Sequence, residues 1–424
     1  MAYLLVMLFS VQTVWSQDRN NGTDVFYYQK KEINNGVLFF LNNERDELRT
    51  DESRFYEKLT TGTAAYQFKF RDWNFMDYKQ DFWELSFDAG SFYGQGNWQD
   101  SSFTGQVKAD HTQYGLRSNL SASYSTRFYY NPVNYTLVEV RGTGRFDLYR
   151  KNQEGIALDS LGEVTQFDEQ FNETKLNLGF EAKAGWGWGR LNPMNNYMLA
   201  EHIMTKYYAG RVFSEKEIRQ LANEIYLIKG QRNVAVGHKT DIESEEISDF
   251  LREKLLLASP GSDVLENDWQ LSEFMPRLNG NRFELGPFFK YYNREPDFIY
   301  GGYVTYENAK YCNLKWNRNL GASLRYNHYK KKDWINAEFS MGWSFFPDLK
   351  RQFDFAVKYI PGIDLNDFSE SVEMNHALIP SVGYYSQINS KSRVNFTFAY
   401  RISADEQQVL PGPEFSLSFY RSRY

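Results

Sequence analysis

The chain has 424 residues, a net charge of −6 and a mean hydropathy of −0.62, and 18% of its residues are aromatic. It contains no long basic run, which argues against a nucleic-acid partner, and its single cysteine, Cys312, excludes an internal disulfide. A polar average with many aromatic side chains is typical of a β-barrel, where apolar and polar faces alternate and cancel. An array of soluble β-sandwiches is the alternative.

The only long apolar stretch lies at the start of the sequence, over residues 3–11. It is too short to cross a bilayer as a helix, and it lies where the hydrophobic region of a signal peptide belongs. We expect residues 1–16 to be a signal peptide that ends at Ser16, although Val14 replaces the usual alanine. No basic region precedes the stretch, so the start of the protein could lie upstream.

Residues 17–191 are predicted to form the first part of a barrel, because apolar and polar side chains alternate over residues 119–128 and 175–188. The first strands, near residues 36–41 and 64–70, are expected to be short. Residues 131–134 are predicted to form a tight turn. The polar, acidic stretch 151–173 is interpreted as a long extracellular loop.

Residues 192–272 are predicted to form a helical insert, because the apolar period changes there from 2 to 3.6. A first helix is expected over residues 195–209, and capping boxes at Ser214 with Glu217 and at Thr240 with Glu243 begin the next two. A short fourth helix is expected over residues 264–271. This insert could cover the pore mouth or dock an envelope partner, or it could be a bundle whose apolar stripes simply pack together.

Residues 273–424 are predicted to form the second part of the barrel, and the alternation is clearest from Ile335 to Phe345. Arg318 falls on the apolar parity of its strand, so we expect it to snorkel or to mark a bulge. The polar parity is expected to face the lumen, either as the lining of a water-filled channel or as a closed network of ion pairs. The predicted lumen-lining residues are Arg141, Arg145, Lys315, Arg325, Glu338, Asp354, Arg393 and Arg401.

Aromatic residues concentrate at the ends of the predicted strands, as the interfacial girdles of a membrane barrel would place them. The candidates are Trp316, Tyr326, Trp334, Trp343, Tyr359 and Tyr400. Long and short connections alternate, with about eight strands after Gly280 and about six before Asn192. The sequence therefore predicts an all-β, antiparallel, up-and-down transmembrane barrel of about 14 strands, with 12 and 16 as alternatives. Both termini and the insert are expected on the periplasmic side.

The last predicted strand runs from Phe415 to Tyr424, and its final aromatic residue resembles the signal that barrel-assembly machinery recognises. Tyr424 does not share the parity of Phe415, so either a bulge near Tyr420 reconciles the two or the signal is imperfect. With the signal peptide, the aromatic strands and the segment 185–193, the chain resembles Bacteroidota-type outer-membrane β-barrel proteins, an uncharacterised, porin-like group. The resemblance implies a Gram-negative outer membrane, contact with its lipid and lipopolysaccharide, and insertion by the assembly machinery.

Three glycines, Gly185, Gly187 and Gly189, share the polar parity, so either another segment approaches the strand there or the strand bends. The basic run at residues 330–332 could meet lipopolysaccharide phosphates or form a solvated turn. None of the five histidines lies in a catalytic or metal-binding motif, and no cofactor or metal is expected. The sequence favours a channel for small hydrophilic solutes. A structural or accessory barrel whose insert docks an envelope partner is the second hypothesis, and a hydrolase using His328 or His376 is the third.

Overall fold

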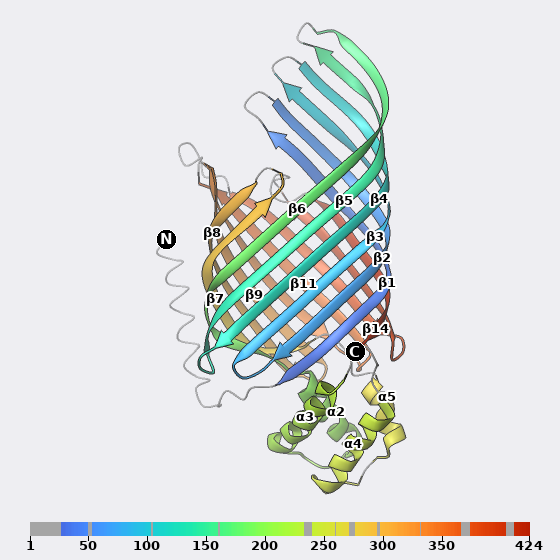
Figure 1. The fold of residues 1–424 in the computed structure, drawn as a ribbon, viewed down its shortest axis with the longest axis vertical. Coiled ribbons are helices and arrows are strands. Elements are labelled where there is room, and N and C mark those ends of the chain that lie inside the picture. Colours follow the sequence, from blue (N-terminus) through green and yellow to red (C-terminus); the bar gives the residue numbers. More distant parts are fainter. Residues whose placement is uncertain are drawn as a thin grey trace.

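The computed structural model describes residues 27–49, 53–102, 105–159, 162–232, 240–258, 260–270, 276–294, 297–330, 332–365, 374–403 and 411–424. They form a closed barrel of 14 antiparallel strands with four helices inserted between the sixth and seventh strands (Figure 1). The predicted fold class is therefore confirmed, and 12 and 16 strands are excluded. The predicted signal peptide lies outside the described residues.

The first six strands are long: β1 (Tyr28–Arg49), β2 (Ser53–Phe75), β3 (Lys79–Ser102), β4 (Gly105–Tyr129), β5 (Asn134–Asp159) and β6 (Val164–Pro193). The other eight are shorter: β7 (Leu278–Tyr292), β8 (Phe298–Asn313), β9 (Trp316–Tyr329), β10 (Lys332–Phe345), β11 (Arg351–Asp364), β12 (Met374–Gln387), β13 (Ser392–Ser403) and β14 (Gly412–Arg423). Each strand pairs with its sequence neighbours, and β1 pairs with β14 to close the ring.

The barrel exterior is apolar because the period of side-chain alternation along a strand is two. On β10, Phe339, Met341 and Trp343 are 50%, 44% and 40% exposed on the outer face, whereas Ser344 is buried inside. The antiparallel register places Phe339 opposite Ala322 of β9 and Tyr359 of β11, so apolar residues continue from strand to strand around the outside.

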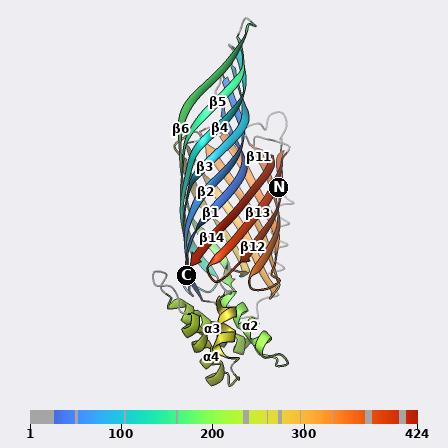
Figure 2. The same ribbon diagram turned by 90° about the vertical axis from the view of Figure 1, so that its right-hand side faces the viewer.

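The two ends of the barrel differ, and we call them the insert end and the wall end. The insert end carries the four helices and the tight turns between strands. At the wall end, β1 pairs with β14 only as far as Leu41, and β6 pairs with β7 only as far as Gly179. Beyond these points β1–β6 rise as a separate six-stranded sheet, the wall, above the rim of the other eight strands (Figures 1 and 2). The wall comprises residues 42–49, 53–62, 92–102, 105–117, 146–159 and 164–178.

The wall corrects two predictions. The stretch 151–173 is not a long loop, because it belongs to β5 and β6 on either side of residues 160–163. The first two strands are 22 and 23 residues long rather than short. In the wall, outward side chains such as Arg150 and Asn152 are as polar as inward ones such as Lys151. The alternation that marks a lipid-facing strand is therefore absent there, and the sequence resembles a loop.

The insert is a small helical bundle made of α2 (Asn195–Tyr207), α3 (Glu215–Gly230), α4 (Thr240–Glu253) and α5 (Ser262–Gln270). Its apolar stripes pack into one core that includes Leu199, Ile203, Leu221, Ile225, Ile247, Leu251 and Trp269. None of the helices in the described ranges is long and apolar enough to cross a membrane.

The two predicted capping boxes have different outcomes. The box of Ser214 and Glu217 is present at the start of α3. Thr240 instead lies inside α4 and donates to Glu266, while Glu243 accepts hydrogen bonds from Arg232 and from the buried Trp269 indole. Glu243 is therefore a partner in the core of the insert rather than a capping residue.

The last strand contains no bulge, because its register with β1 is continuous from Phe415 to Arg423. Phe419 points outward and is 49% exposed, whereas Tyr424 is buried at 3%. The mismatch in parity is therefore real, and the final aromatic side chain faces inward. Arg318 is in register with Lys310, but the pairing of β8 with β9 shifts close to it, between Tyr311 and Asn313, and the Arg318 side chain donates to Asn308 of β8 over 3.3 Å.

Candidate functional site

The predicted lumen residues lie in several separate clusters rather than in one site. Arg145 and Asp354 line one cavity inside the barrel. Arg325 of β9 contacts Glu181 of β6 at 3.4 Å, a contact between strands separated by two others in the ring. Inward-facing side chains from distant strands therefore meet inside the barrel.

Three more predicted residues have partners of their own. Glu338 pairs with Lys358 over 3.3 Å, and Arg401 donates to Asn42 of β1 over 2.5 Å. Arg393 of β13 is buried and donates to the Tyr385 hydroxyl of β12 over 2.9 Å. This hydrogen bond joins two neighbouring strands on the inner face of the barrel.

Lys315 and Trp334 differ from their predictions. Lys315 lies in the turn between β8 and β9 and faces a cavity next to the insert, because the strand begins at Trp316 and not before it. Trp334 packs against the buried side chains of Phe288 and Tyr303, on the parity of the inner face. Its position at the start of a strand suggested a girdle, but its parity opposes that of the outward-facing aromatics.

The other five girdle candidates are exposed on the barrel exterior, at 37% to 46%. Trp316 and Trp343 lie near the insert end, and Tyr326, Tyr359 and Tyr400 lie near the wall end. Their placement in two bands follows the pattern of interfacial aromatics, and their contact with a membrane interface stays a prediction.

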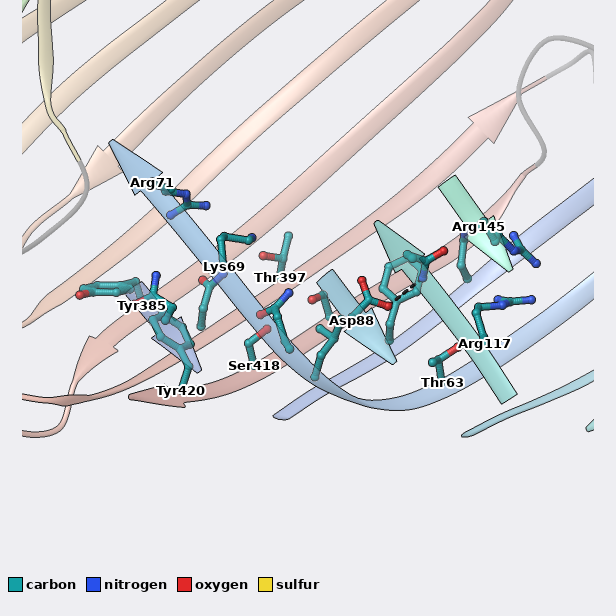
Figure 3. A pocket seen from close by; sticks show the side chains of 18 of the residues that line it. Thr63, Lys69, Arg71, Asp88, Arg117, Arg145, Tyr385, Thr397, Ser418 and Tyr420 are labelled. Atoms are coloured by element: carbon teal, nitrogen blue, oxygen red, sulfur yellow. Dashed lines mark hydrogen bonds between the residues drawn. The ribbon is translucent and has the colours of Figure 1, made fainter. Parts of the chain in front are cut away.

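One interior cavity has a volume of about 740 Å³ and lies between β1–β5 and β11–β14 (Figure 3). One side presents charged groups, including Lys69, Asp88 and Arg117. The opposite side presents hydroxyl and amide groups, which belong to Gln352, Asn395, Thr397, Ser416 and Ser418. The cavity therefore suits a hydrated solute better than an apolar one.

Two smaller cavities adjoin it. One of about 340 Å³ lies against β8–β10, and one of about 240 Å³ lies between α2 and the turn that contains Phe346. Gln352 lines all three cavities, and its amide donates to both carboxylate oxygens of Asp354 at 2.8 and 2.9 Å. Gln352 is thus a lining residue that the three interior cavities share.

The wall curls so that its inner face is filled by ion pairs. Glu44 of β1 accepts 2.7 Å hydrogen bonds from Arg117 of β4 and Arg145 of β5, and Asp147 also contacts both arginines. Higher in the wall, Glu57, His111 and Lys151 form a similar group. These contacts span several strands, so the wall narrows the interior at its end of the barrel.

The glycine series on β6 makes room for an aromatic side chain. A Cβ at Gly187 would lie 2.3 Å from the ring of Tyr135 on β5, and Tyr135 is fully buried. The approaching group is a neighbouring side chain, not a plug or a helix. Gly189 adds a conformational reason, because its φ of +91° favours glycine.

Glu284 anchors the same region from β7. It contacts Arg127 of β4 at 2.7 Å and Arg282 at 3.1 Å, and it accepts a 3.1 Å hydrogen bond from the Tyr135 hydroxyl. This buried group stabilises the inner face of β4–β7 toward the insert end.

Several contacts hold the insert against the barrel, and Arg277, which precedes β7, ties this junction to the turn between β8 and β9. Its guanidinium donates to the carbonyls of Asn313 and Leu314 at 2.9 Å each and lies 3.8 Å from the ring of Phe346. Tyr311 of β8 also donates to Glu201 of α2 over 2.6 Å. The insert therefore sits against the mouth of the barrel, as Figures 1 and 2 show.

Sequence reasoning missed Gln352, Arg277 and Glu44. Glu44 shares parity with Glu32 and Asn34, so a longer first strand would have placed it on the inner face. Gln352 shares the parity of Asp354, which marks it as inward-facing, but no local pattern shows that three cavities share it. Arg277 carries no signal in the sequence, because its partners lie in the distant turn between β8 and β9.

The histidines of the hydrolase hypothesis each contact one polar side chain. His328 Nδ1 lies 2.6 Å from Asp333, and His376 Nδ1 lies 2.5 Å from the Tyr359 hydroxyl. Neither contact contains a serine, threonine or cysteine. The hypothesis stays untested.

A closed antiparallel barrel with an apolar exterior and a polar, partly hollow interior defines a transmembrane β-barrel of the outer-membrane type.

No family model matches the sequence, and no curated protein matches it. Among solved structures, the chain is similar to the translocator domain of the autotransporter NalP from Neisseria meningitidis, with 10% identity, coverage of 100% and 96% of the two chains, and a TM-score of 0.26. It is also similar to an outer membrane channel from Pseudomonas putida F1, with 7% identity, 96% and 98% coverage, and a TM-score of 0.29. A bacterial polysaccharide outer membrane secretin gives 7% identity, 95% and 100% coverage, and a TM-score of 0.34. No activity of this chain follows from them.

Proposed function

We propose that the protein is a channel of a Gram-negative outer membrane that passes small hydrophilic solutes. The observation that carries the proposal is that three interior cavities share Gln352 as a lining residue, and one of these cavities reaches the insert. Their lining offers hydroxyl, amide and charged groups that can replace part of the hydration shell of a solute.

The orientation follows from the connections between strands. Outer-membrane barrels have short turns on the periplasmic side and longer loops outside. The two longest connections outside the insert, between β11 and β12 and between β13 and β14, lie at the wall end, whereas no turn between strands at the insert end exceeds five residues, so we assign the insert to the periplasm and the wall to the exterior. The girdle aromatics and the apolar face between them then contact lipid.

In this channel the insert covers the mouth without filling the interior. The cavity of about 240 Å³ lies between Met198 and His202 of α2 and the turn at residues 346–351. It provides a lateral route from the interior to the periplasm. Lys315 lines this route and would meet each solute that leaves.

Planar-bilayer conductance of the full chain tests the proposal. Gln352→Trp should reduce single-channel conductance severalfold, because the larger side chain fills space that the cavities share. Val357→Trp is the matched control, since Val357 is 43% exposed on the outer face. Absence of conductance in the parent protein, or equal conductance in both variants, would contradict the proposal.

A further inference from the structure

The inner face of β5–β9 holds a cluster in which cations outnumber carboxylates. Glu181 of β6 lies 3.4 Å from Lys183, 3.4 Å from Arg325 and 3.9 Å from Lys290. Lys183 also pairs with Glu139 over 3.0 Å. We call the four cations Arg141, Lys183, Lys290 and Arg325 with the two glutamates the entrance cluster.

Arg141 gives the cluster its excess of positive charge. Arg141 is exposed inside the barrel and is aligned with Glu181 in the strand register. Its guanidinium makes no hydrogen bond or ion pair with any residue of the described ranges. Its charge, with those of Arg325 and Lys183, repels the ammonium of Lys290, and Glu181 attracts it. Two carboxylates therefore face four cations.

Two other ion clusters of the interior are balanced. Arg117 and Arg145 face Glu44 and Asp147, and Lys358 faces Glu338. The balanced groups already neutralise their own charge. The surplus at the entrance cluster requires either mobile counterions or a ligand of negative charge.

The cluster lies at the wall-end opening. Glu181 pairs with Lys290, which is two residues from the last residue of β7, Tyr292. β7 and β8 end at the rim of the barrel, whereas β5 and β6 continue past the rim into the wall. The Arg325 and Lys290 side chains keep 33% and 19% of their surface exposed, so a solute can reach them.

Two of the four cationic side chains pack against a buried aromatic ring. Lys290 and Arg325 lie 5.7 and 5.9 Å from the ring of Phe288, which is buried at 4%. Two guanidinium groups and two ammonium groups on a rigid sheet match the oxygens of a carboxylate or a phosphate, because a guanidinium binds such groups with two parallel hydrogen bonds.

From this arrangement we infer that the entrance cluster binds small oxyanions, carboxylates or phosphates, and makes the channel anion-selective. The selectivity rests on the proposed channel function, whereas binding can be measured without it. The cluster supplies the first contact of an anionic solute that enters from the wall end.

The test compares Arg141→Gln and Lys290→Gln with Lys358→Gln, a lumen cation of a balanced pair. In a potassium chloride gradient the parent channel should show a reversal potential on the anion-selective side. Arg141→Gln and Lys290→Gln should move it toward zero, and Lys358→Gln should not. Succinate and inorganic phosphate should each bind the detergent-solubilised full chain, about tenfold more weakly in Lys290→Gln, and their relative affinities distinguish the two anion classes.

The outcomes separate the two proposals. A conducting channel without anion selectivity, or equal shifts in all three variants, overturns the entrance cluster and leaves the channel. A protein that does not conduct overturns the channel, and calorimetric titration with succinate and phosphate then decides the cluster alone. Binding that Lys290→Gln weakens and Lys358→Gln preserves supports the site, and no binding overturns it.

Discussion

The ammonium of Lys30 lies 4.5 Å from the centre of the Tyr424 ring, so the first strand contacts the residue that follows the last strand. The Arg393 guanidinium lies 4.8 Å from the same ring, and Glu32 pairs with Lys30 over 3.3 Å. All four side chains are buried. This inward-facing cluster stabilises the seam where the ring of strands closes.

Replacing Tyr424 with leucine should weaken the seam. The variant keeps an apolar side chain but loses the ring that faces two buried cations, which we expect to lower stability by about 2 kcal/mol. The temperature at which the folded band disappears in semi-native electrophoresis measures the effect. Tyr424→Phe, which keeps the ring, should behave like the parent protein. A Leu variant as stable as the Phe variant would show that the cation–ring contacts contribute nothing.

Gly187→Ala should strain the inner face of β6. The added methyl group would overlap the Tyr135 ring and also lie 2.6 Å from the Phe283 carbonyl, so we expect a loss of about 1–3 kcal/mol. Denaturant unfolding of the barrel measures it. The matched control is Gly142→Ala, where the added atom meets nothing within 4 Å. Combining Gly187→Ala with Tyr135→Leu should restore part of the loss, and full additivity would argue against the overlap with the ring.

Arg277→Met should loosen the insert from the barrel. Burial lowers the pKa of Arg277 to about 10, so the side chain remains charged at neutral pH and satisfies turn carbonyls. Its loss should cost about 3 kcal/mol because buried carbonyls lose their donors. Limited proteolysis should cut the insert faster while the barrel stays protected. Exposed Arg252→Met is the control, and identical cleavage rates in both variants would refute the anchoring role.

The packing of α5 on α2 should weaken in acid. Burial alone would raise the pKa of Asp268, but hydrogen bonds from His202, Lys206 and Tyr207 outweigh burial and lower it to about 2. A lowered folded pKa means that this stabilisation is complete above the ordinary aspartate pKa and is lost as the pH falls from about 4 to about 2. Hydrogen exchange of the α2 and α5 amides should therefore accelerate over that range.

Asp268→Asn supplies the control for the acid effect. The variant should exchange faster already at pH 6 and should change less between pH 4 and pH 2 than the parent protein. The same acid response in both proteins would mean that other carboxylates cause it.

Predictability from sequence depended on whether one face of an element is apolar. Strands such as Lys332–Phe345 have one apolar and one polar face, so their alternation predicted the barrel and its 14 strands. The core of the insert followed in the same way from its apolar stripes. The wall was missed because the outward side chains in its middle, such as Arg150, Asn152 and Gln170, are polar. The Bacteroidota-type resemblance and the docking of an envelope partner stay predictions.

The candidate site was predicted in part. Parity placed Arg141 and Arg325 on a polar face, but it could not show that they approach the same glutamate from strands far apart in the ring. Trp334 was assigned to the girdle because it lies at the start of a strand, although its parity is that of the inner face. Gln352 was missed because its place in the lining of three cavities is a property of the closed ring and not of any local pattern.

The wall leaves a long strand edge beyond the closed ring of strands. Residues 164–178 of β6 pair with β5 and with no other strand of the described ranges until Gly179 meets β7. Such an edge invites strand addition by a second molecule. This one carries Asp168, Glu169 and Glu173, so two copies that met edge to edge would bring rows of like charge together. In a crowded bilayer, this repulsion would keep neighbouring barrels from joining into a continuous sheet.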